Sequence, residues 1–340
     1  MTLGVRLGRA ARTLGLGCTL FSCNPAPTSS PAPAPKATET PRTTSREPLE
    51  ALPQVPTLDT RVVALGRRLF HEPRLSGDSK VSCSSCHNLE KGGVDSKPFS
   101  LGVSGKVGLV NAPTVYNSAL NFVQFWDGRA ATLEEQIGGP ITNPIEMGAS
   151  WEKVLAALQT DPSYVAEFSA LPGGVTEPNV RRAIADFERT LLTRGSAFDR
   201  FLGGDEAALG SEARAGYEMF KSVGCIACHQ GRNVGGNMFQ RFGVLGDYFK
   251  DRGHVSDADY GRYNVTHNES DRYVFRVPSL RNVVHTAPYF HDGSAATLPQ
   301  AVQVMARYQL GRKLSDEQVK EIIAFLSSLS GDQAPAGAKI

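Results

Sequence analysis

The stretch Val81-Ser-Cys-Ser-Ser-Cys-His-Asn88 decides the fold of this chain, because it contains the pattern Cys-x-x-Cys-His. That pattern is the attachment signature of a c-type haem: both thiols add to the haem vinyl groups, and the histidine coordinates the iron. A second copy lies at Cys225-Ile-Ala-Cys-His229. The sequence therefore predicts two covalently bound haem c groups, attached at Cys83, Cys86, Cys225 and Cys228 and held at the iron by His87 and His229.

Two other interpretations of this pattern are a pair of disulfides and a zinc site. A structural zinc ion needs four ligands, so each Cys-x-x-Cys-His triplet would have to recruit more from elsewhere. A Cys-x-x-Cys disulfide gives no reason for a histidine after both copies. Haem attachment accounts for all three residues of each copy.

An internal repeat organises the rest of the chain. Pro113-Thr-Val-Tyr-Asn117 matches Pro278-Ser-Leu-Arg-Asn282, an offset of 165 residues (278 − 113). At the same offset, the nine residues from Phe125 match the nine from Phe290. The sequence therefore predicts two copies of one haem domain. The second copy carries a Gly-rich excursion over residues 231–276, which we expect at the domain interface or against a partner.

Several segments have the spacing of an amphipathic helix, and none alternates as a strand should. One follows Thr176, and another follows Ser315, with which Gln318 completes a capping box. Helix-like runs over residues 62–70 and 213–220 precede the two haem motifs. The predicted fold class is all-α, with two tandem cytochrome c-like haem domains at residues 57–205 and 206–335.

The N-terminal region predicts export from the cytoplasm. Residues 1–22 carry three arginines and a short apolar run from Leu14 to Phe21, typical of a signal peptide and too short to span a membrane. Leu20-Phe-Ser-Cys23 resembles a bacterial lipobox, with an ordinary signal peptide as the alternative. We expect a periplasmic protein whose membrane contact is a lipid anchor at Cys23.

Residues 23–56 are rich in Pro, Ala, Thr and Ser and poor in large apolar side chains. Such a segment cannot offset the entropy lost on ordering by burying apolar surface, so we expect a disordered tether. The whole chain of 340 residues has a formal net charge of only +2. This charge gives no electrostatic footprint for nucleic acid, and we expect no nucleic-acid partner.

The order of motifs resembles that of the bacterial dihaem cytochrome c peroxidases. The motifs are Leu69-Phe-His-Glu-Pro-Arg-Leu-Ser76, both haem signatures, Asn111-Ala-Pro-Thr-Val115, Gln124-Phe-Trp-Asp-Gly-Arg129, Glu146-Met147, Ala287-Pro-Tyr-Phe-His291 and Val304-Met305. The resemblance implies that the N-terminal haem meets hydrogen peroxide, while the C-terminal haem accepts electrons from a small cytochrome c or cupredoxin. It also implies a homodimer.

The repeat makes the two haems unequal. Met305 lies on the helix-like run after Thr297, and the 165-residue offset puts Pro140 at the equivalent place. Proline cannot ligate iron. We therefore expect Met305 to be the second axial ligand beside His229, with Met219 and Met238 as weaker candidates and core packing as the alternative role.

The resemblance also assigns residues to the peroxide chemistry. Glu146 matches the catalytic glutamate of the family, and a carboxyl group beside an open haem face can relay the proton that peroxide cleavage requires. Gln136 is similar to the distal-pocket glutamine. Trp126 matches an aromatic bridge between the haems, for which ordinary core packing is the alternative.

Asn111, Thr286 and Pro288 match positions through which the family binds a calcium ion. One side-chain amide and two backbone carbonyls form a hard-oxygen set suited to calcium. His291, the repeat partner of Trp126, is expected to bond a haem propionate or to support Met305.

Many members close the peroxide haem at rest with a loop histidine eight residues before the Asn of Asn-x-Pro-Thr-Val. Counting back from Asn111 places Val103 there, and no histidine or methionine lies between His87 and Asn111. Lys106 is a conceivable ligand only after losing its proton. We therefore expect the His87 haem to be open at rest.

The leading hypothesis is a periplasmic peroxidase that reduces hydrogen peroxide to water. The superfamily also contains MauG-like enzymes, which oxidise a protein side chain and carry a tyrosine as the sixth ligand of the second haem. Met305 argues against that alternative. A dihaem electron carrier or redox sensor is the third.

Overall fold

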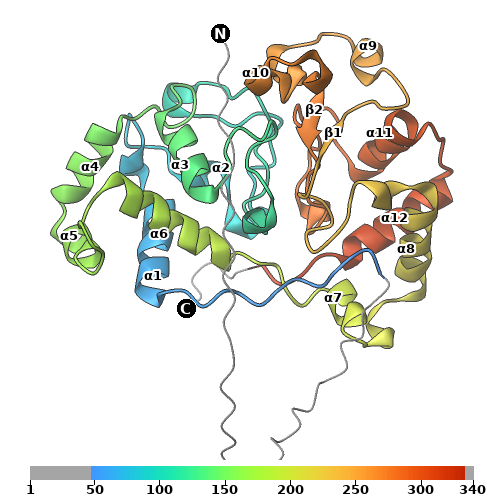
Figure 1. Cartoon of the computed structure of the whole chain (residues 1–340), viewed down its shortest axis with the longest axis horizontal. Helices are drawn as coiled ribbons and strands as arrows, with labels where there is room; N and C mark the ends of the chain where they lie inside the picture. The colour runs from blue at the N-terminus through green and yellow to red at the C-terminus, as the bar shows by residue number, and fades with distance from the viewer. Residues whose placement is uncertain (1–46, 334–340) are drawn as a thin grey trace, which may run out of the picture. The chain divides into compact units, whose positions relative to one another are not determined.

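The structure is a computed structural model that describes residues 47–333 (Figure 1). The expected signal peptide over residues 1–22, the expected anchor at Cys23 and most of the expected tether lie outside the described residues. No helix in the described part combines the length and the apolar character needed to cross a membrane.

Helices dominate the described part of the chain, which confirms the all-α prediction. The first haem signature lies among α1 (Thr60–Phe70), α2 (Cys83–Cys86), α3 (Leu133–Thr142), α4 (Trp151–Gln159), α5 (Pro162–Phe168) and α6 (Glu177–Thr190). The second lies among α7 (Ala197–Leu202), α8 (Ser211–Val223), α9 (Tyr248–Arg252), α10 (Tyr263–Thr266), α11 (Leu298–Leu310) and α12 (Asp316–Ser328).

The helices expected after Thr176 and Ser315 are α6 and α12. Ser315 and Gln318 form the predicted capping box, with the Gln318 N–H donating to Ser315 Oγ (3.2 Å) and the Ser315 N–H donating to Gln318 Oε1 (2.9 Å). The Thr176 side chain makes no cap hydrogen bond, so α6 begins without that stabilisation.

Two short strands depart from the sequence prediction. β1 (Phe239–Arg241) pairs antiparallel with β2 (Val274–Arg276), with Gln240 opposite Phe275. Three residues are too few for an alternating pattern to stand out in the sequence. The pair forms because the excursion over residues 231–276 folds back on itself.

The same helix crossing occurs in both halves. A Cβ atom on Gly66 of α1 would lie 1.8 Å from the Ala183 carbonyl oxygen of α6, and one on Gly216 of α8 would lie 1.8 Å from the Glu321 carbonyl oxygen of α12. Only glycine allows the backbones to approach this closely. The repeat seen in the sequence therefore extends to the packing of the first and last long helices of each half.

Each crossing belongs to a separate hydrophobic cluster. The first includes Phe70, Ile184 and Phe187, and Cys83 packs against it. The second includes Phe220, Phe325 and Leu326, and Cys225 packs against it. A third, smaller cluster is built largely from the excursion, and it contains Phe242, Tyr248, Phe249, Phe275 and Tyr308.

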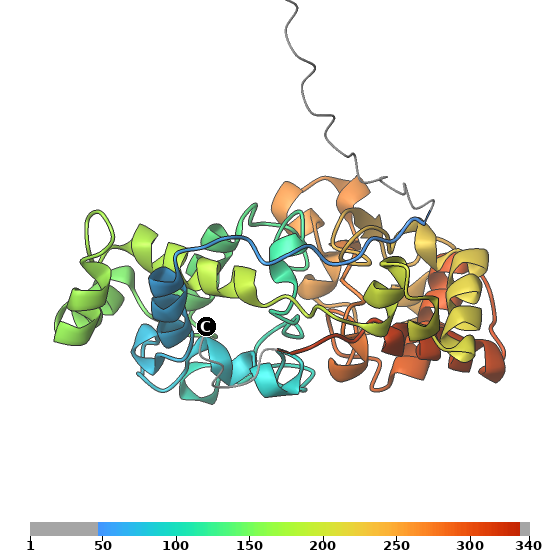
Figure 2. The ribbon, with the colours of Figure 1, turned by 90° about the horizontal axis from the view of Figure 1, so that it is seen from below.

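Residues 47–56 are not part of a disordered tether, contrary to the sequence prediction. Leu49 is 1% exposed and belongs to the second cluster. The Gly231 N–H donates to the Pro48 carbonyl (3.1 Å), and Arg281 Nη2 donates to the Glu50 carbonyl (2.9 Å). From there the segment runs to α1 in the first half (Figure 2). The Glu50 carboxylate also pairs with Arg232 (2.8 Å). The composition gave no sign of this docking, because its partners lie far along the chain.

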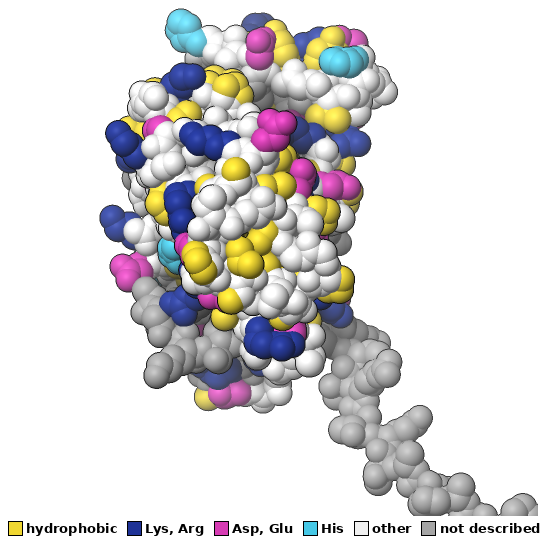
Figure 3. All heavy atoms as spheres, turned by 90° about the vertical axis from the view of Figure 1, so that its left-hand side faces the viewer, with side chains coloured by type: hydrophobic (Ala, Val, Ile, Leu, Met, Phe, Trp, Pro, Cys, Tyr) yellow, Lys and Arg dark blue, Asp and Glu magenta, His cyan; other side chains and the backbone are white. Residues whose placement is uncertain are grey.

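The face near α4 and α5 carries charges of both signs. Figure 3 shows Lys and Arg side chains interspersed with Asp, Glu and apolar side chains among its described residues. Such mixing produces no extended field of one sign on this face.

Replacing Gly216 with alanine tests the helix crossing. We expect Gly216→Ala to lower the free energy of unfolding by about 1–3 kcal/mol or more, because the added methyl group forces α8 away from α12. The loss should outweigh the helix propensity of alanine, about 1 kcal/mol better than that of glycine. Denaturant titration of the haem-loaded protein measures it. Gly210→Ala is the control, since its Cβ would have no neighbour within 4 Å; equal effects would contradict the close crossing.

Candidate functional site

Each Cys-x-x-Cys-His triplet lies at its own cavity. The first cavity, of about 170 Å³, is lined by Cys83, Cys86 and His87. The second, of about 240 Å³, is lined by Cys225, Cys228 and His229. The structure thus brings together all three residues of each predicted haem motif.

A single helical turn presents each motif to its cavity. The His87 N–H donates to the Cys83 carbonyl (2.9 Å), and the His229 N–H donates to the Cys225 carbonyl (3.1 Å). This turn places the first cysteine and the histidine on one side of the backbone. The described cysteines form no disulfide, so the disulfide interpretation does not apply to them.

The environment of each motif histidine favours a neutral imidazole that can bind a metal through Nε2. His87 Nδ1 lies 3.2 Å from the Gly93 carbonyl oxygen, and His229 Nδ1 lies 3.3 Å from the Val234 carbonyl oxygen. A proton on Nδ1 satisfies these contacts and leaves Nε2 for a metal. Burial lowers the pKa of His87 and lowers the pKa of His229 to about 4. These observations fit a proximal haem ligand at each site.

The first cavity contains the predicted peroxide residues. Glu146, Gln136 and Pro140 all line it together with His87. Asn143 Nδ2 donates to Glu146 Oε1 (2.7 Å), which fixes one oxygen of the carboxyl group. Burial raises the pKa of Glu146, although Arg129 and Asn143 oppose the shift. The carboxyl group can therefore hold a proton at a higher pH than an exposed glutamate.

The loop after the first motif packs against the Glu146 segment. The Val103 N–H donates to the Glu146 carbonyl (2.7 Å), and Lys106 Nζ donates to the Pro144 carbonyl (3.1 Å). Lys106 does not line the first cavity. Among the described lining residues, Met147 is the one methionine, and His87 is the one histidine.

The second cavity contains Met305. This residue lies on α11, and the helix cap Thr297 stands 165 residues after the α3 cap Thr132 (297 − 132). Pro140 lines the first cavity and Met305 lines the second, so the structure places them at matching sites. Met219 and Met238 are absent from the second cavity's described lining.

A single wall separates the two cavities. Phe125 lines the first cavity and the adjacent Trp126 lines the second. Trp126 Nε1 donates to the Asn111 carbonyl (2.9 Å). Both cavities share wall residues, namely Ala112, Pro113, Thr114, Asn121 and Arg276. Trp126 is therefore positioned on the second side of this wall.

The three expected calcium residues meet at the second cavity. Asn111, Thr286 and Pro288 all line it. Asn111 Nδ2 donates to the Lys97 carbonyl (2.8 Å), and its Oδ1 atom accepts no hydrogen bond from the described residues. An amide oxygen and backbone carbonyl oxygens are ligands that calcium prefers.

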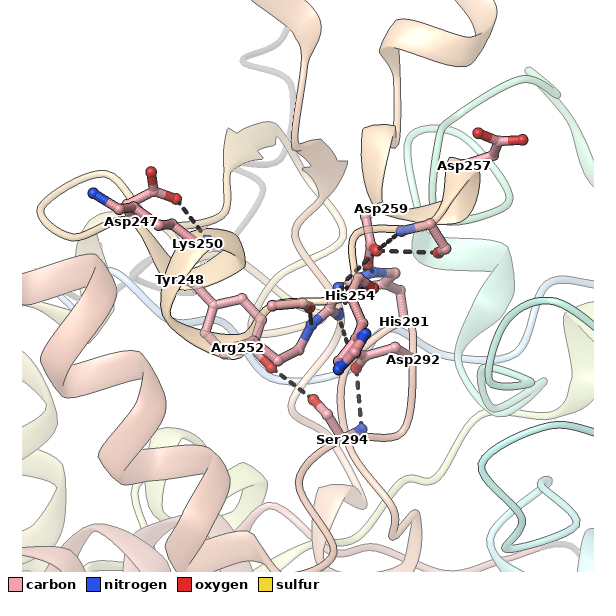
Figure 4. Close-up of polar contacts among 12 residues, drawn as sticks. Asp247, Tyr248, Lys250, Arg252, His254, Asp257, Asp259, His291, Asp292 and Ser294 are labelled. Carbon is pink, nitrogen blue, oxygen red and sulfur yellow. Dashed lines mark hydrogen bonds and ion pairs between the residues drawn. The ribbon is translucent and has the colours of Figure 1, made fainter.

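His291 lies in the wall of the second cavity and bonds a carboxylate of the excursion. Its Nε2 atom lies 2.7 Å from Asp259 Oδ1, and its ring stacks on Phe275 with centroids 4.4 Å apart. Arg252 pairs with Asp259 (2.6 Å) and with Asp292 (Figure 4). The excursion therefore supplies the groups that hold His291 in the wall of the second cavity.

Glu188 is a further residue of the first cavity, and it is not among those that the sequence motifs indicated. This residue of α6 lines the first cavity and is 5% exposed, and burial raises its pKa to about 8. The helix repeat (321 − 183 = 138) places Leu326 at the equivalent position in the second cavity. The sequence does contain a signal for this burial. Glu188 follows Val180 and Ile184 at intervals of four residues, and a residue at i+4 from Ile184 lies on the same buried face of the helix.

The sequence and structure comparisons agree on one family. Residues 60–207 match the profile of the di-haem cytochrome c peroxidases, and residues 213–330 match that of cytochrome c. The chain is 49% identical to cytochrome c peroxidase Ccp of Escherichia coli (strain K12), over 85% of this chain and 62% of that protein. It is 45% identical to cytochrome c551 peroxidase of Nitrosomonas europaea, over 85% of this chain and 86% of that protein. The chain thus spans less than two thirds of the first relative and most of the second.

A solved structure supports the same fold. The crystal structure of a MauG-like protein associated with microbial copper homeostasis has a TM-score of 0.72 and 27% identity, covering 88% of this chain and 97% of that one. With the cytochrome c match, this similarity confirms the predicted cytochrome c-like, all-α class.

The buried Glu188 predicts a specific pH dependence of stability. Its folded-state pKa of about 8 lies above the unfolded value of 4.5, so its contribution is complete below pH 4.5 and is lost as the pH rises to about 8. We expect wild type to lose stability relative to Glu188→Gln over this range, by up to about 1.4 kcal/mol per pH unit. Denaturant titrations at pH 5 to 8 measure the difference. The exposed Glu152→Gln is the control, and parallel curves for Glu188→Gln and wild type would contradict the buried acid.

Proposed function

This chain belongs to the di-haem cytochrome c peroxidase family, and from that premise we propose that it reduces hydrogen peroxide to water with electrons from a small cytochrome c or cupredoxin. The observation that carries the proposal is the wall of the first cavity. There, Glu146 and Gln136 line the same space as His87, and Pro140 stands where the second cavity has Met305. This cavity offers a carboxyl group and an amide, and α3 offers it no strong second ligand for the haem iron. Such a cavity suits the binding of peroxide.

The reaction consumes two electrons and two protons and yields two waters from each hydrogen peroxide. The haem iron supplies the redox chemistry that breaks the O–O bond. The protein must move a proton onto the departing oxygen. Glu146 and Glu188 both line the cavity, and we assign this step to Glu146, which matches the catalytic glutamate of the family. Asn143 holds Oε1 (2.7 Å), which leaves Oε2 as the atom that exchanges the proton. The Gln136 amide would orient the peroxide by hydrogen bonding.

The second cavity would receive the electrons. His229 and Met305 would hold its haem, and a thioether ligand favours ferrous iron. Trp126 lies in the wall that both cavities share, where an aromatic ring would bridge the haems.

Location, anchoring, calcium and assembly complete the proposal. The signal-like residues 1–22 support a periplasmic enzyme, and Cys23 supports lipid attachment. Asn111, Thr286 and Pro288 would bind one calcium ion at the edge of the second cavity. The family resemblance supports a homodimer.

Oxidation of a protein side chain is the second candidate, favoured by the similarity to a MauG-like structure. That chemistry is paired with a tyrosine ligand in MauG-like enzymes. Met305 in the lining of the second cavity favours peroxide reduction instead.

Replacing Glu146 tests the proposed chemistry. We expect the wild type to turn over hydrogen peroxide with a reduced cytochrome c or cupredoxin. Glu146→Gln should lose about 10²- to 10⁴-fold in turnover while keeping two haems, because the proton carrier is gone. Glu152→Gln should retain turnover. Near-normal turnover by Glu146→Gln would remove this residue from the mechanism, and an inactive wild type would overturn the proposed function.

Replacing Met305 tests the second axial ligand. We expect Met305→His to lower the reduction potential of the second haem substantially, because imidazole stabilises ferrous iron less than a thioether does. Spectroelectrochemical titration measures the potential. Met219→Leu should leave it unchanged. If Met305→His also leaves it unchanged, Met305 is a core residue.

The spectrum of the oxidised protein as isolated tests whether the loop at Val103 leaves the His87 haem without a second axial ligand. We expect high-spin ferric signals from the His87 haem in the isolated protein, and reaction of the fully oxidised protein with peroxide. Two low-spin haems at rest would contradict this expectation. Met147→Leu would then show whether the buried methionine has become the ligand.

A further inference from the structure

Arg276 is a buried cation between the two cavities. It is the last residue of β2, is 3% exposed and lines both cavities. The other residues of the shared wall are uncharged. The Arg276 N–H donates to the Trp126 carbonyl (2.8 Å), and Nε donates to the Phe125 carbonyl (3.2 Å). Arg276 is therefore fixed to the loop that lines both cavities.

Arg276 has no acidic partner among the described residues. Two other arginines of the second half show the usual solution: Arg281 pairs with Asp199 (2.9 Å), and Arg252 pairs with Asp259 and Asp292. A buried guanidinium without a counter-ion carries a large desolvation penalty. Burial lowers the pKa of Arg276 to about 10, so it remains charged at neutral pH. An anion in the cavities would supply the counter-charge that the described residues do not.

The repeat shows that the haem domain itself does not require this charge. Counting back 165 residues from Arg276 gives Asn111 (276 − 165). Asn111 is a neutral side chain whose Nδ2 atom bonds the Lys97 carbonyl (2.8 Å). A positive charge therefore occurs in one copy only, at the wall between the cavities.

We propose that Arg276 binds the carboxylates of both haems and is the shared counter-ion of the two prosthetic groups. Each haem carries two propionate groups, which are the anions that a loaded cavity brings with it. Nε is used by the Phe125 carbonyl, so Nη1 and Nη2 remain to face one carboxylate from each side. The inference rests on haem occupancy and on the family's two haems, and not on peroxide turnover.

One consequence concerns both reduction potentials. A fixed positive charge stabilises the reduced form of a nearby iron, because ferric haem carries one more positive charge than ferrous haem. Arg276 would therefore raise both potentials together. Its backbone N–H and its side chain also hold the loop that carries Phe125 and Trp126.

Arg276→Gln tests this proposal in the full-length, haem-loaded protein. The two reduction potentials are measured separately by spectroelectrochemical titration, after a pyridine haemochrome assay confirms two haems. We expect both potentials to fall. Arg262→Gln is the matched control, because its guanidinium lies over the Phe239 ring (4.0 Å) and lines neither cavity. Potentials unchanged by Arg276→Gln, or a fall at one haem alone, would overturn the shared counter-ion.

Arg276→Lys keeps the proposal testable if the glutamine variant fails to load haem. Lysine keeps the charge but loses the two-sided fork. We expect the propionate bending bands of both haems to shift in resonance Raman spectra, with the potentials closer to wild type than those of the glutamine variant. Unshifted bands would overturn the proposal. Neither measurement depends on peroxide turnover, so failure of the peroxidase assay and failure of this inference remain distinct.

Discussion

The close helix crossing in each half is the constraint on which the rest of the structure depends. Gly66 lets α1 rest on the α6 backbone at Ala183, and Gly216 lets α8 rest on the α12 backbone at Glu321. A larger side chain at either glycine would separate the helices and loosen the cluster behind the cysteines. The haem motif then needs only one helical turn to reach its cavity. The same glycine-mediated helix crossing thus supports both haem sites.

The two halves differ in function at positions where the repeat carries different residues. Pro140 and Met305 occupy matching helices, and one of them can bind iron. Glu188 and Leu326 occupy matching buried positions, and one of them can hold a proton. Asn111 and Arg276 occupy matching wall positions, and one of them carries a charge. Each difference changes a chemical property at a matching position of the repeat, and in this way one kind of domain can serve two roles.

The sequence predicted the features that are written in local patterns. The haem triplets, the helices after Thr176 and Ser315 and the domain repeat could all be found by spacing alone. The β1–β2 pair and the partner of His291 could not, because both depend on how the excursion folds back. The docking of residues 47–56 escaped for the same reason, since Leu49 gains its partners from residues far along the chain. Asn111, Thr286 and Pro288 could be grouped only through the family resemblance.

The docked segment at residues 47–56 also has a consequence for biosynthesis. Its contacts with Asp199, Gly231 and Arg281 join the first described residues to the second half. A growing chain cannot complete these contacts until Arg281 has been made, although α1 and α6 are available to each other earlier. Vectorial synthesis therefore leaves the segment undocked while the first half forms, and its closure marks a chain in which both halves are present. A fragment ending near residue 205 would keep α1 and Phe198 but would leave Leu49 without the rest of its cluster, which includes Phe220 and Phe325.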